Sequence, residues 1–193
     1  MMNLAVFASG SGSNFESLVN AVEKGQLKAD IKLLVCDKKD AYVIERAKNH
    51  GIPVFLFQPK NYPTKAAFEE EILCELQNWN VDLVVLAGYM RLIGPTLLAA
   101  FEHRIINIHP SLLPAFPGLD AIGQAFEAGV KVSGVTIHYV DAGMDTGPII
   151  AQESVKVEES DTKEDLQRKI QQIEHDLYPT TLQRVIEQMT RRV

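Results

Sequence analysis

The sequence has little of several features that define whole classes of protein. Its 193 residues include two cysteines and no CxxC pair, which argues against a zinc ribbon or a thioredoxin-like site. Asp and Glu (25) outnumber Lys and Arg (19), and the net charge of −6 without a basic block argues against nucleic-acid binding through phosphates. No apolar run reaches the roughly 18 residues of a membrane span, and the N-terminus does not resemble a signal peptide. We therefore expect a cytoplasmic protein whose thiols, Cys36 and Cys74, are free and buried.

Apolar segments alternate with amphipathic helical patterns over the first two-thirds of the chain. Phe15, Leu18, Val19 and Val22 have helical spacing, and Asp40 and Thr64 are candidate caps of two further helices. Continuous apolar strands joined by helices are typical of a parallel sheet covered on both faces, so we predict a doubly wound, Rossmann-like α/β fold. The predicted strands are 4–8, 31–36, 52–57, 81–87 and 104–108.

The last third of the sequence has a different pattern. Residues 132–140 alternate apolar with polar side chains as an antiparallel strand does, and 149–157 can pair with them. A long final helix starts near Asp161 and Thr162, and Pro179 is expected to bend or break it. Because there is neither a repeat nor a long linker, we assign one domain to residues 1–193.

A loop rich in glycine and serine, residues 9–14, follows the first strand and precedes a helix. Glycine lets the backbone approach an anion, and a helix start offers free N–H groups, so the loop predicts a phosphate site. Two other interpretations stay open. One is a dinucleotide fingerprint, with Asp37 as the ribose-binding acid but Phe15 at the third glycine position. The other is a structural capping box formed by Ser13 and Glu16.

A second candidate site follows the fifth predicted strand. Asn107 and His109 are two residues apart and so point to the same side of the strand, at its carboxyl end. A carboxamide and an imidazolium suit acyl transfer, because both can stabilise an oxyanion. Asp145, in a glycine-rich acidic loop, is the natural partner to keep the imidazole charged. A purely structural histidine, and turn roles for Asp141 and Asp145, remain the alternatives.

Two other kinds of site receive no support from the sequence. The five histidines lack the spacing of metal ligands, so no metal site is predicted. There is no G-x-S-x-G elbow of a serine hydrolase.

Four motifs together resemble the phosphoribosylglycinamide formyltransferase family of folate-dependent formyltransferases. They are Ala8–Asn14, Leu86–Arg91, Asn107–Pro114 and Val140–Pro148, and they span nearly the whole chain in the family's order. The resemblance implies transfer of a formyl group from 10-formyltetrahydrofolate to the amine of N1-(5-phospho-D-ribosyl)glycinamide in purine biosynthesis. It implies small-molecule substrates, no tightly bound cofactor, no metal and a possible homodimer.

The resemblance also implies roles for individual residues. Catalysis would fall to Asn107, His109 and Asp145. The phosphoribosyl substrate would be bound by Gly12, Ser13 and Asn14 at its phosphate and by Gln171, Gln172, Ile173 and Glu174 elsewhere, with Glu174 near the amine. The folate would be bound by Lys65, Met90, Arg91, Leu92, Ile93, Asn107, Asp141, Ala142, Gly143, Met144 and Asp145. The phosphoribosyl half would cover about 1–100 and the folate and catalytic half about 85–193, with a cis peptide at Leu113–Pro114.

Several of these residues, each considered alone, could equally well have an ordinary structural role. Met90 and Leu92 could be core residues, Lys65 could be solvated, and Glu174 could lie on the surface. Asp120 departs from the family, in which histidine is common, and we place it outside the chemistry.

The activity itself also has alternatives. These are a formyltetrahydrofolate hydrolase, with water as acceptor, and a non-catalytic dinucleotide-binding module. The methionyl-tRNA relative carries an RNA-binding domain after the region matched here, and this chain shows no such domain.

Overall fold

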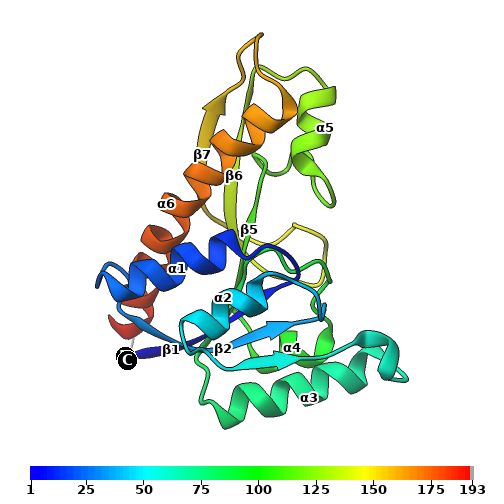
Figure 1. The fold of residues 1–193 in the computed structure, drawn as a ribbon, viewed down its shortest axis with the longest axis vertical. Helices are drawn as coiled ribbons and strands as arrows, with labels where there is room; N and C mark the ends of the chain where they lie inside the picture. Colours follow the sequence, from blue (N-terminus) through cyan, green and yellow to red (C-terminus); the bar gives the residue numbers. More distant parts are fainter. Residues whose placement is uncertain (192–193) are drawn as a thin grey trace.

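The structure, a computed structural model that describes residues 1–191, has one seven-stranded sheet in the order β3-β2-β1-β4-β5-β6-β7 (Figure 1). Strands β1 to β5 are parallel, β6 is antiparallel to β5, and β7 is antiparallel to β6. This confirms the predicted doubly wound fold with antiparallel C-terminal strands. The strands are β1 (Met2–Ala8), β2 (Ala29–Cys36), β3 (Val54–Leu56), β4 (Leu83–Leu86), β5 (Ile105–His109), β6 (Val132–Tyr139) and β7 (Ile149–Lys156).

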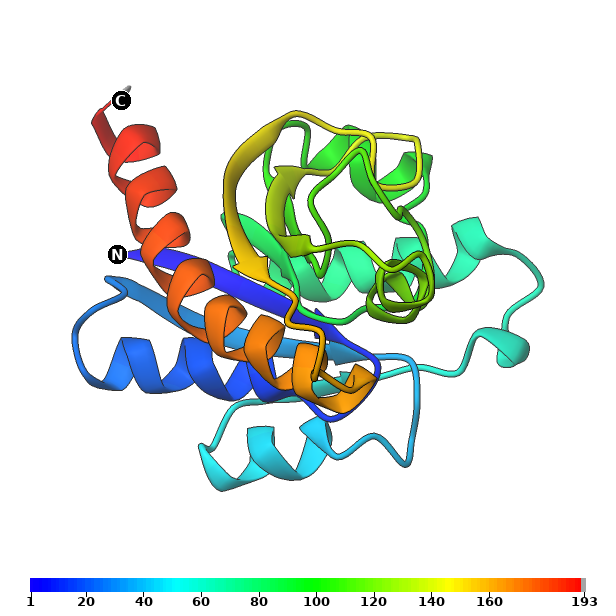
Figure 2. The same ribbon diagram turned by 90° about the horizontal axis from the view of Figure 1, so that it is seen from above.

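Helices cover both faces of the sheet. One buried cluster joins the sheet to α1, α2 and α6, and a second joins the other face to α3 and α4. Helices α1 and α6 lie side by side in both ribbon views (Figures 1 and 2). The helices are α1 (Ser13–Glu23), α2 (Val43–Asn49), the 3-10 helix η1 (Pro59–Asn61), α3 (Lys65–Asn78), α4 (Pro95–Ala100), α5 (Ala121–Glu127) and α6 (Lys163–Arg191).

The first strand shows why a continuous apolar run becomes a central strand. All five residues from Leu4 to Ala8 are fully buried. Val6 and Ala8 belong to the cluster under α1 and α6, whereas Ala5 and Phe7 belong to the cluster under α3. Side chains alternate across a strand, so only a strand that is covered on both faces can bury such a run.

Helix starts were predicted with mixed success. Thr64 caps α3 by accepting a hydrogen bond from the Ala67 amide (3.1 Å), as expected. The predicted cap at Asp40 is wrong, because α2 starts at Val43 and Tyr42 occupies its N-cap position. The capping-box interpretation is also wrong: Gly12 is the N-cap of α1, and Ser13 is its first residue.

Three other expectations have clear outcomes. Cys36 and Cys74 are both free, but only Cys36 is buried; Cys74 lies on the solvent side of α3. The peptide before Pro114 is cis, as the resemblance implied. Over residues 1–191, no helix combines the length and the apolar character that crossing a membrane requires.

The expected break at Pro179 is wrong, because α6 continues through it as one helix. Proline has no N–H, so the carbonyl of His175, four residues earlier, lacks its helical donor. The Ser17 hydroxyl on α1 donates to that carbonyl at 2.7 Å. A donor from the neighbouring helix thus replaces the missing intrahelical bond, which no local sequence rule could anticipate.

Replacing Ser17 with Ala should lower the free energy of unfolding by about 1–2 kcal/mol, because the His175 carbonyl loses its donor in a partly buried place. In a Pro179→Ala background the same change should cost little, since the alanine introduced there supplies an N–H. Urea unfolding of the two single variants and the double variant measures this coupling. An equal loss in both backgrounds would show that Ser17 does not compensate for Pro179.

Candidate active site

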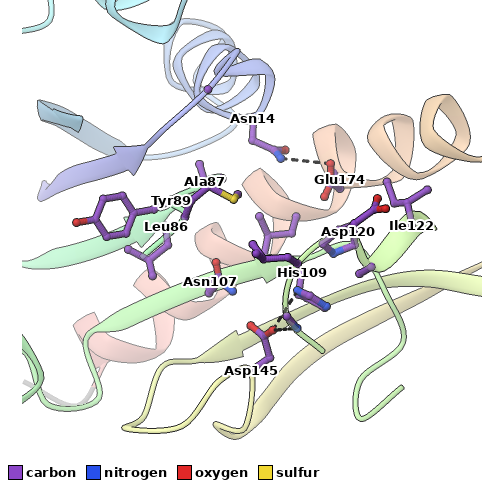
Figure 3. Close-up of a pocket in the computed structure, with 18 of the residues that line it drawn as sticks. Asn14, Leu86, Ala87, Tyr89, Asn107, His109, Asp120, Ile122, Asp145 and Glu174 are labelled. Atoms are coloured by element: carbon purple, nitrogen blue, oxygen red, sulfur yellow. Dashed lines mark hydrogen bonds and ion pairs between the residues drawn. The ribbon is translucent and has the colours of Figure 1, made fainter. Parts of the chain in front are cut away.

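A cavity of about 560 Å³ opens at the carboxyl ends of β1, β4 and β5. In open α/β sheets, ligands bind where the strand order reverses, which here is between β1 and β4. The walls come from the loops after these three strands, from the loop before β7 and from one face of α6 (Figure 3). The cavity therefore takes side chains from both the first and the last elements of the chain.

The loop after β1 is held by helix α2. The Val43 amide donates to the Gly10 carbonyl (3.1 Å), and Arg46 Nε donates to the Ser11 carbonyl (2.9 Å). Gly12 has a φ of 75°, and a Cβ there would lie 2.4 Å from Val43 Cγ2. Glycine is thus required both for the backbone conformation and for the close approach of α2. The result is a fixed turn that presents the amino end of α1 to the cavity, as an anion site requires.

Glu174 of α6 faces this loop from inside the cavity (Figure 3). Asn14 Nδ2 donates to Glu174 Oε2 at 3.3 Å, while Asn14 Oδ1 is buried without a partner. Burial raises the pKa of Glu174 to about 7, and the Asn14 hydrogen bond opposes this only in part. Glu174 is therefore a buried residue, which rules out the surface role that its sequence position allowed.

Asn107 and His109 project from the same side of β5, as their spacing predicted, and both line the cavity. In the antiparallel register Asn107 is opposite His138 of β6, and Asn107 Nδ2 lies 3.1 Å from His138 Nε2. His138 Nδ1 lies 2.8 Å from the Tyr139 carbonyl oxygen. Burial lowers the pKa of His138, so it is neutral at pH 7. The network assigns its proton to Nδ1 and leaves Nε2 to accept from Asn107.

His109 has an acceptor at each ring nitrogen. Nδ1 lies 3.4 Å from Asp145 Oδ2, and Nε2 lies 2.8 Å from the Phe116 carbonyl oxygen. Both ring nitrogens of His109 thus have an oxygen partner, which fixes the plane and the direction of the imidazole.

Asp145 lies between the two imidazoles. Its Oδ1 is 3.7 Å from His138 Nε2, and its Oδ2 also accepts from the Gly118 amide at 2.7 Å. Its backbone is left-handed, with a φ of 55°, a conformation that aspartate adopts more readily than most residues. Figure 3 shows the Asp145 carboxylate directed toward His109.

The segment after β4 forms another wall of the cavity. Met90 and Leu92 are exposed and line the cavity, so the core role that their sequence position allowed is wrong. Lys65 does not line it, but its ammonium group donates to the Leu92 carbonyl and so contacts this wall from behind. Asp37, the candidate ribose-binding acid, is buried and accepts from Ser9 and Arg91, which leaves it unavailable to a dinucleotide ribose.

Not every residue named from the sequence faces the cavity. Gln171 and Glu174 line it, but Gln172 is exposed away from it and Ile173 packs against the core. The cavity is lined by Gly12, Ser13, Asn14, Met90, Arg91, Leu92, Ile93, Asn107, His109, Gly143, Met144 and Asp145, but not by Asp141 or Ala142.

Sequence reasoning left some lining residues unassigned. His138 was missed; its signal was its position opposite Asn107 once the strands are paired. Asp120, which we placed outside the chemistry, lines the cavity, caps α5 and pairs with Lys163 (3.0 Å). Within residues 1–191, no group of three or more His, Cys, Asp and Glu side chains is arranged to hold a metal ion.

The cavity of this doubly wound sheet brings an amide, an imidazole and a carboxylate together beside the turn at Gly12, an arrangement that suits group transfer. Residues 2–182 match the formyl transferase family, and the chain belongs to that family. Its relatives include phosphoribosylglycinamide formyltransferases. The Bacillus subtilis protein is 56% identical over 186 residues, covering 96% of this chain and 95% of its own. The Escherichia coli protein is 35% identical over 181 residues, covering 94% and 85%.

Solved structures agree with this placement. The phosphoribosylglycinamide formyltransferase of Bacillus halodurans has a TM-score of 0.94 at 60% identity and covers 95% of both chains. The glycinamide ribonucleotide transformylase 1 of Geobacillus kaustophilus also has a TM-score of 0.94 at 60% identity, covering 96% of this chain and 98% of that chain. Fold and sequence therefore point to the same branch of the family.

Replacing Gly12 with Ala tests the rigid turn. The left-handed backbone alone should cost about 1–2 kcal/mol, and the contact with Val43 should add to it. Gly25→Ala is the matched control, because Gly25 has a φ of 71° but nothing within 4 Å of an added Cβ. We expect Gly12→Ala to be the less stable of the two in urea unfolding. Equal decreases in the free energy of unfolding would mean that α2 moves to accommodate the added methyl group.

Proposed function

We infer that this protein transfers the formyl group of 10-formyltetrahydrofolate to the amine of N1-(5-phospho-D-ribosyl)glycinamide, giving the N-formyl product and tetrahydrofolate in purine biosynthesis. The observation that carries this conclusion is one cavity in which Asn107, His109 and Asp145 meet, next to a turn suited to phosphate. Membership of the formyl transferase family and the named relatives support the same reaction. The co-substrate carries the one-carbon unit, so the reaction needs no metal.

The chemistry begins with attack of the substrate amine on the formyl carbon. The bound amine first gives its extra proton to water, its freed lone pair then forms the new C–N bond, and the carbonyl oxygen becomes an oxyanion. The second N–H of Asn107, whose first N–H is directed at His138, and the imidazole of His109 stabilise that oxyanion. Donors fixed before the reaction need no reorganisation when the charge develops, and holding both substrates in one cavity replaces a difficult bimolecular encounter.

The intermediate then collapses with transfer of one proton. The attacking nitrogen loses a proton, N10 of the folate gains one, and the bond between N10 and the formyl carbon breaks. Asp145 orients His109 through its contact with Nδ1 and can organise a water that relays the proton. The neutral His138 fixes the orientation of the Asn107 carboxamide, so His138 is a positioning residue.

We assign the phosphoribosyl substrate to the α1 side of the cavity. Gly12, Ser13 and Asn14 would bind the phosphate, because they form the fixed turn at the amino end of α1. Glu174, with Gln171 beside it, would face the amine end of the substrate. A cationic amine approaching Glu174 would favour its ionised form and supply the partner that this buried carboxyl otherwise lacks.

We assign the folate to the wall formed by 90–93 and the loop 141–145. Met90, Leu92 and Met144 expose apolar surface there, which suits a flat pterin ring, and backbone groups of the same segments are available for polar contacts. Lys65 and Asp141 would act behind this wall: Lys65 supports the Leu92 carbonyl, and Asp141 accepts hydrogen bonds from Gly143 and Thr146.

The hydrolase alternative is less favoured by the site. Water as acceptor needs neither the turn at Gly12 nor a buried carboxyl at position 174, yet both line the cavity. We also propose that residues 1–193 act as one domain, because one sheet contributes to both substrate subsites. A cytoplasmic location is supported by two unpaired thiols. A homodimer stays a prediction from the resemblance.

Removal of the proposed catalytic groups should lower turnover sharply. Asn107→Ala, His109→Ala and Asp145→Ala should each lose on the order of 100- to 1000-fold at saturating substrates, because each removes or misaligns an oxyanion donor. The control is His103→Ala, which removes an exposed imidazole. The assay follows tetrahydrofolate release with and without the glycinamide substrate. Near-normal rates in all three variants would contradict the mechanism, and release without that substrate would indicate a hydrolase.

Glu174→Gln should make the free protein more stable at high pH. The pKa of Glu174 is about 7 when folded, against an ordinary 4.5, so the stabilising protonated form is lost as pH rises from about 4.5 through 7. Glutamine does not titrate, so the variant should gain roughly 2–3 kcal/mol over wild type between pH 5 and pH 8, at about 1.4 kcal/mol per pKa unit. Asp176→Asn, on the exposed side of α6, should show no such trend in urea unfolding.

The same Glu174→Gln variant should bind the glycinamide substrate more weakly, because glutamine cannot become the charged partner of an amine. A stability difference that stays flat from pH 5 to pH 8 would show that Glu174 is already ionised in the free protein.

A further inference from the structure

Asp37 is a buried carboxylate that the formyl transfer does not use. It follows β2 directly, and only 1% of its side chain is exposed. A buried charge is costly unless it is paired and hydrogen-bonded, so its partners indicate its role.

The partners of Asp37 belong to two different walls of the active site. Oδ1 accepts from the Ser9 hydroxyl at 2.6 Å, and Oδ2 accepts from Arg91 Nε at 2.7 Å. Ser9 Oγ in turn accepts from the Met90 amide at 3.0 Å, and the Ser9 amide donates to the Gly88 carbonyl at 3.0 Å. The carboxylate and one hydroxyl therefore join the end of β1, where the phosphate turn begins, to the segment after β4.

The ion pair between Asp37 and Arg91 has one buried and one partly exposed partner. Arg91 has 39% of its side chain exposed and lines the cavity, whereas Asp37 lies beneath it. Asp37 accepts from Nε of Arg91, so this bond does not occupy the terminal nitrogens of the guanidinium. A charge-assisted bond of this kind fixes the side chain more firmly than a neutral one.

We propose that Asp37 is the positioning residue of the folate subsite, acting through Arg91 directly and through Ser9 on the Met90 amide. The identity of the ligand in this inference rests on the proposed function. Fixing the segment 88–93 before the co-substrate arrives removes an ordering cost from binding. The link to Ser9 also sets the distance between this wall and the phosphate turn.

The experiment compares Asp37→Asn with wild type. Asparagine keeps the shape and an acceptor for Ser9 but removes the charge that holds Arg91. The KM for 10-formyltetrahydrofolate and the Kd for tetrahydrofolate should both rise about tenfold, equivalent to ~1.4 kcal/mol. The KM for the glycinamide substrate should change less than about threefold, an order-of-magnitude allowance for indirect effects. Asp30→Asn, which removes an exposed carboxylate from the same strand, is the control and should change neither constant. Equal increases for both substrates would overturn the proposal.

A double-mutant cycle with Arg91→Gln distinguishes an effect of Asp37 that acts through Arg91 from a general loss of folding. If Asp37 acts through Arg91, adding Asp37→Asn to Arg91→Gln should raise the folate KM by less than about twofold further, because contacting residues are not additive. Fully multiplicative effects would overturn the proposal. Arg91 is partly exposed, so Arg91→Gln should fold even if Asp37→Asn lowers stability. The single Arg91→Gln variant then still tests whether the guanidinium contributes to the folate KM.

Amide hydrogen exchange gives a readout that does not depend on activity. Asp37→Asn and Ser9→Ala should both lower the protection of residues 88–93 while leaving α3 unchanged. Wild type could show protected amides in residues 88–93 but neither turnover nor tetrahydrofolate binding. The proposed function would then fail, while the role of Asp37 in holding this segment would stand. If protection of 88–93 is the same in all three proteins, the positioning role fails.

Discussion

The carboxylate of Asp145 is the constraint on which the rest of the catalytic geometry depends. It is the one group that contacts His109, approaches His138 and accepts from the Gly118 amide. Through these contacts it ties β5 and β6 to the loops that follow β5 and precede β7. Because His138 also orients Asn107, displacement of this single carboxylate would disturb the direction of both donors. The left-handed backbone at Asp145 is the local strain that this arrangement requires.

Three carboxyl groups around the cavity differ in their partners. Asp37 has a guanidinium at 2.7 Å, and Asp145 has two imidazoles and an amide N–H within reach. Glu174 has only a carboxamide, and burial raises its pKa to about 7. Within residues 1–191, Glu174 has no cationic partner, and a bound amine would supply one.

Sequence patterns predicted those features whose cause is local. The alternation of side chains along 107–109 placed Asn107 and His109 on one face, the apolar run at 4–8 gave a buried central strand, and Thr64 capped its helix. Apart from the helix starts at Asp40 and Ser13, which are local errors, the failures involve partners distant in sequence. Pro179 stays within α6 because Ser17 compensates it, and Cys74 faces solvent because of how α3 is rotated against the sheet. His138 joins the site only through strand pairing. The catalytic and binding roles came from the family resemblance and remain predictions.

The contact between Asn14 and Glu174 joins residues 160 positions apart. During synthesis on a ribosome, the turn that would take the phosphate emerges long before the helix opposite it. Sheet strands β1 to β5 can pair before that helix exists, but the pocket stays open on one side until α6 docks beside α1. A nascent chain would therefore build most of its sheet first and close this pocket only later.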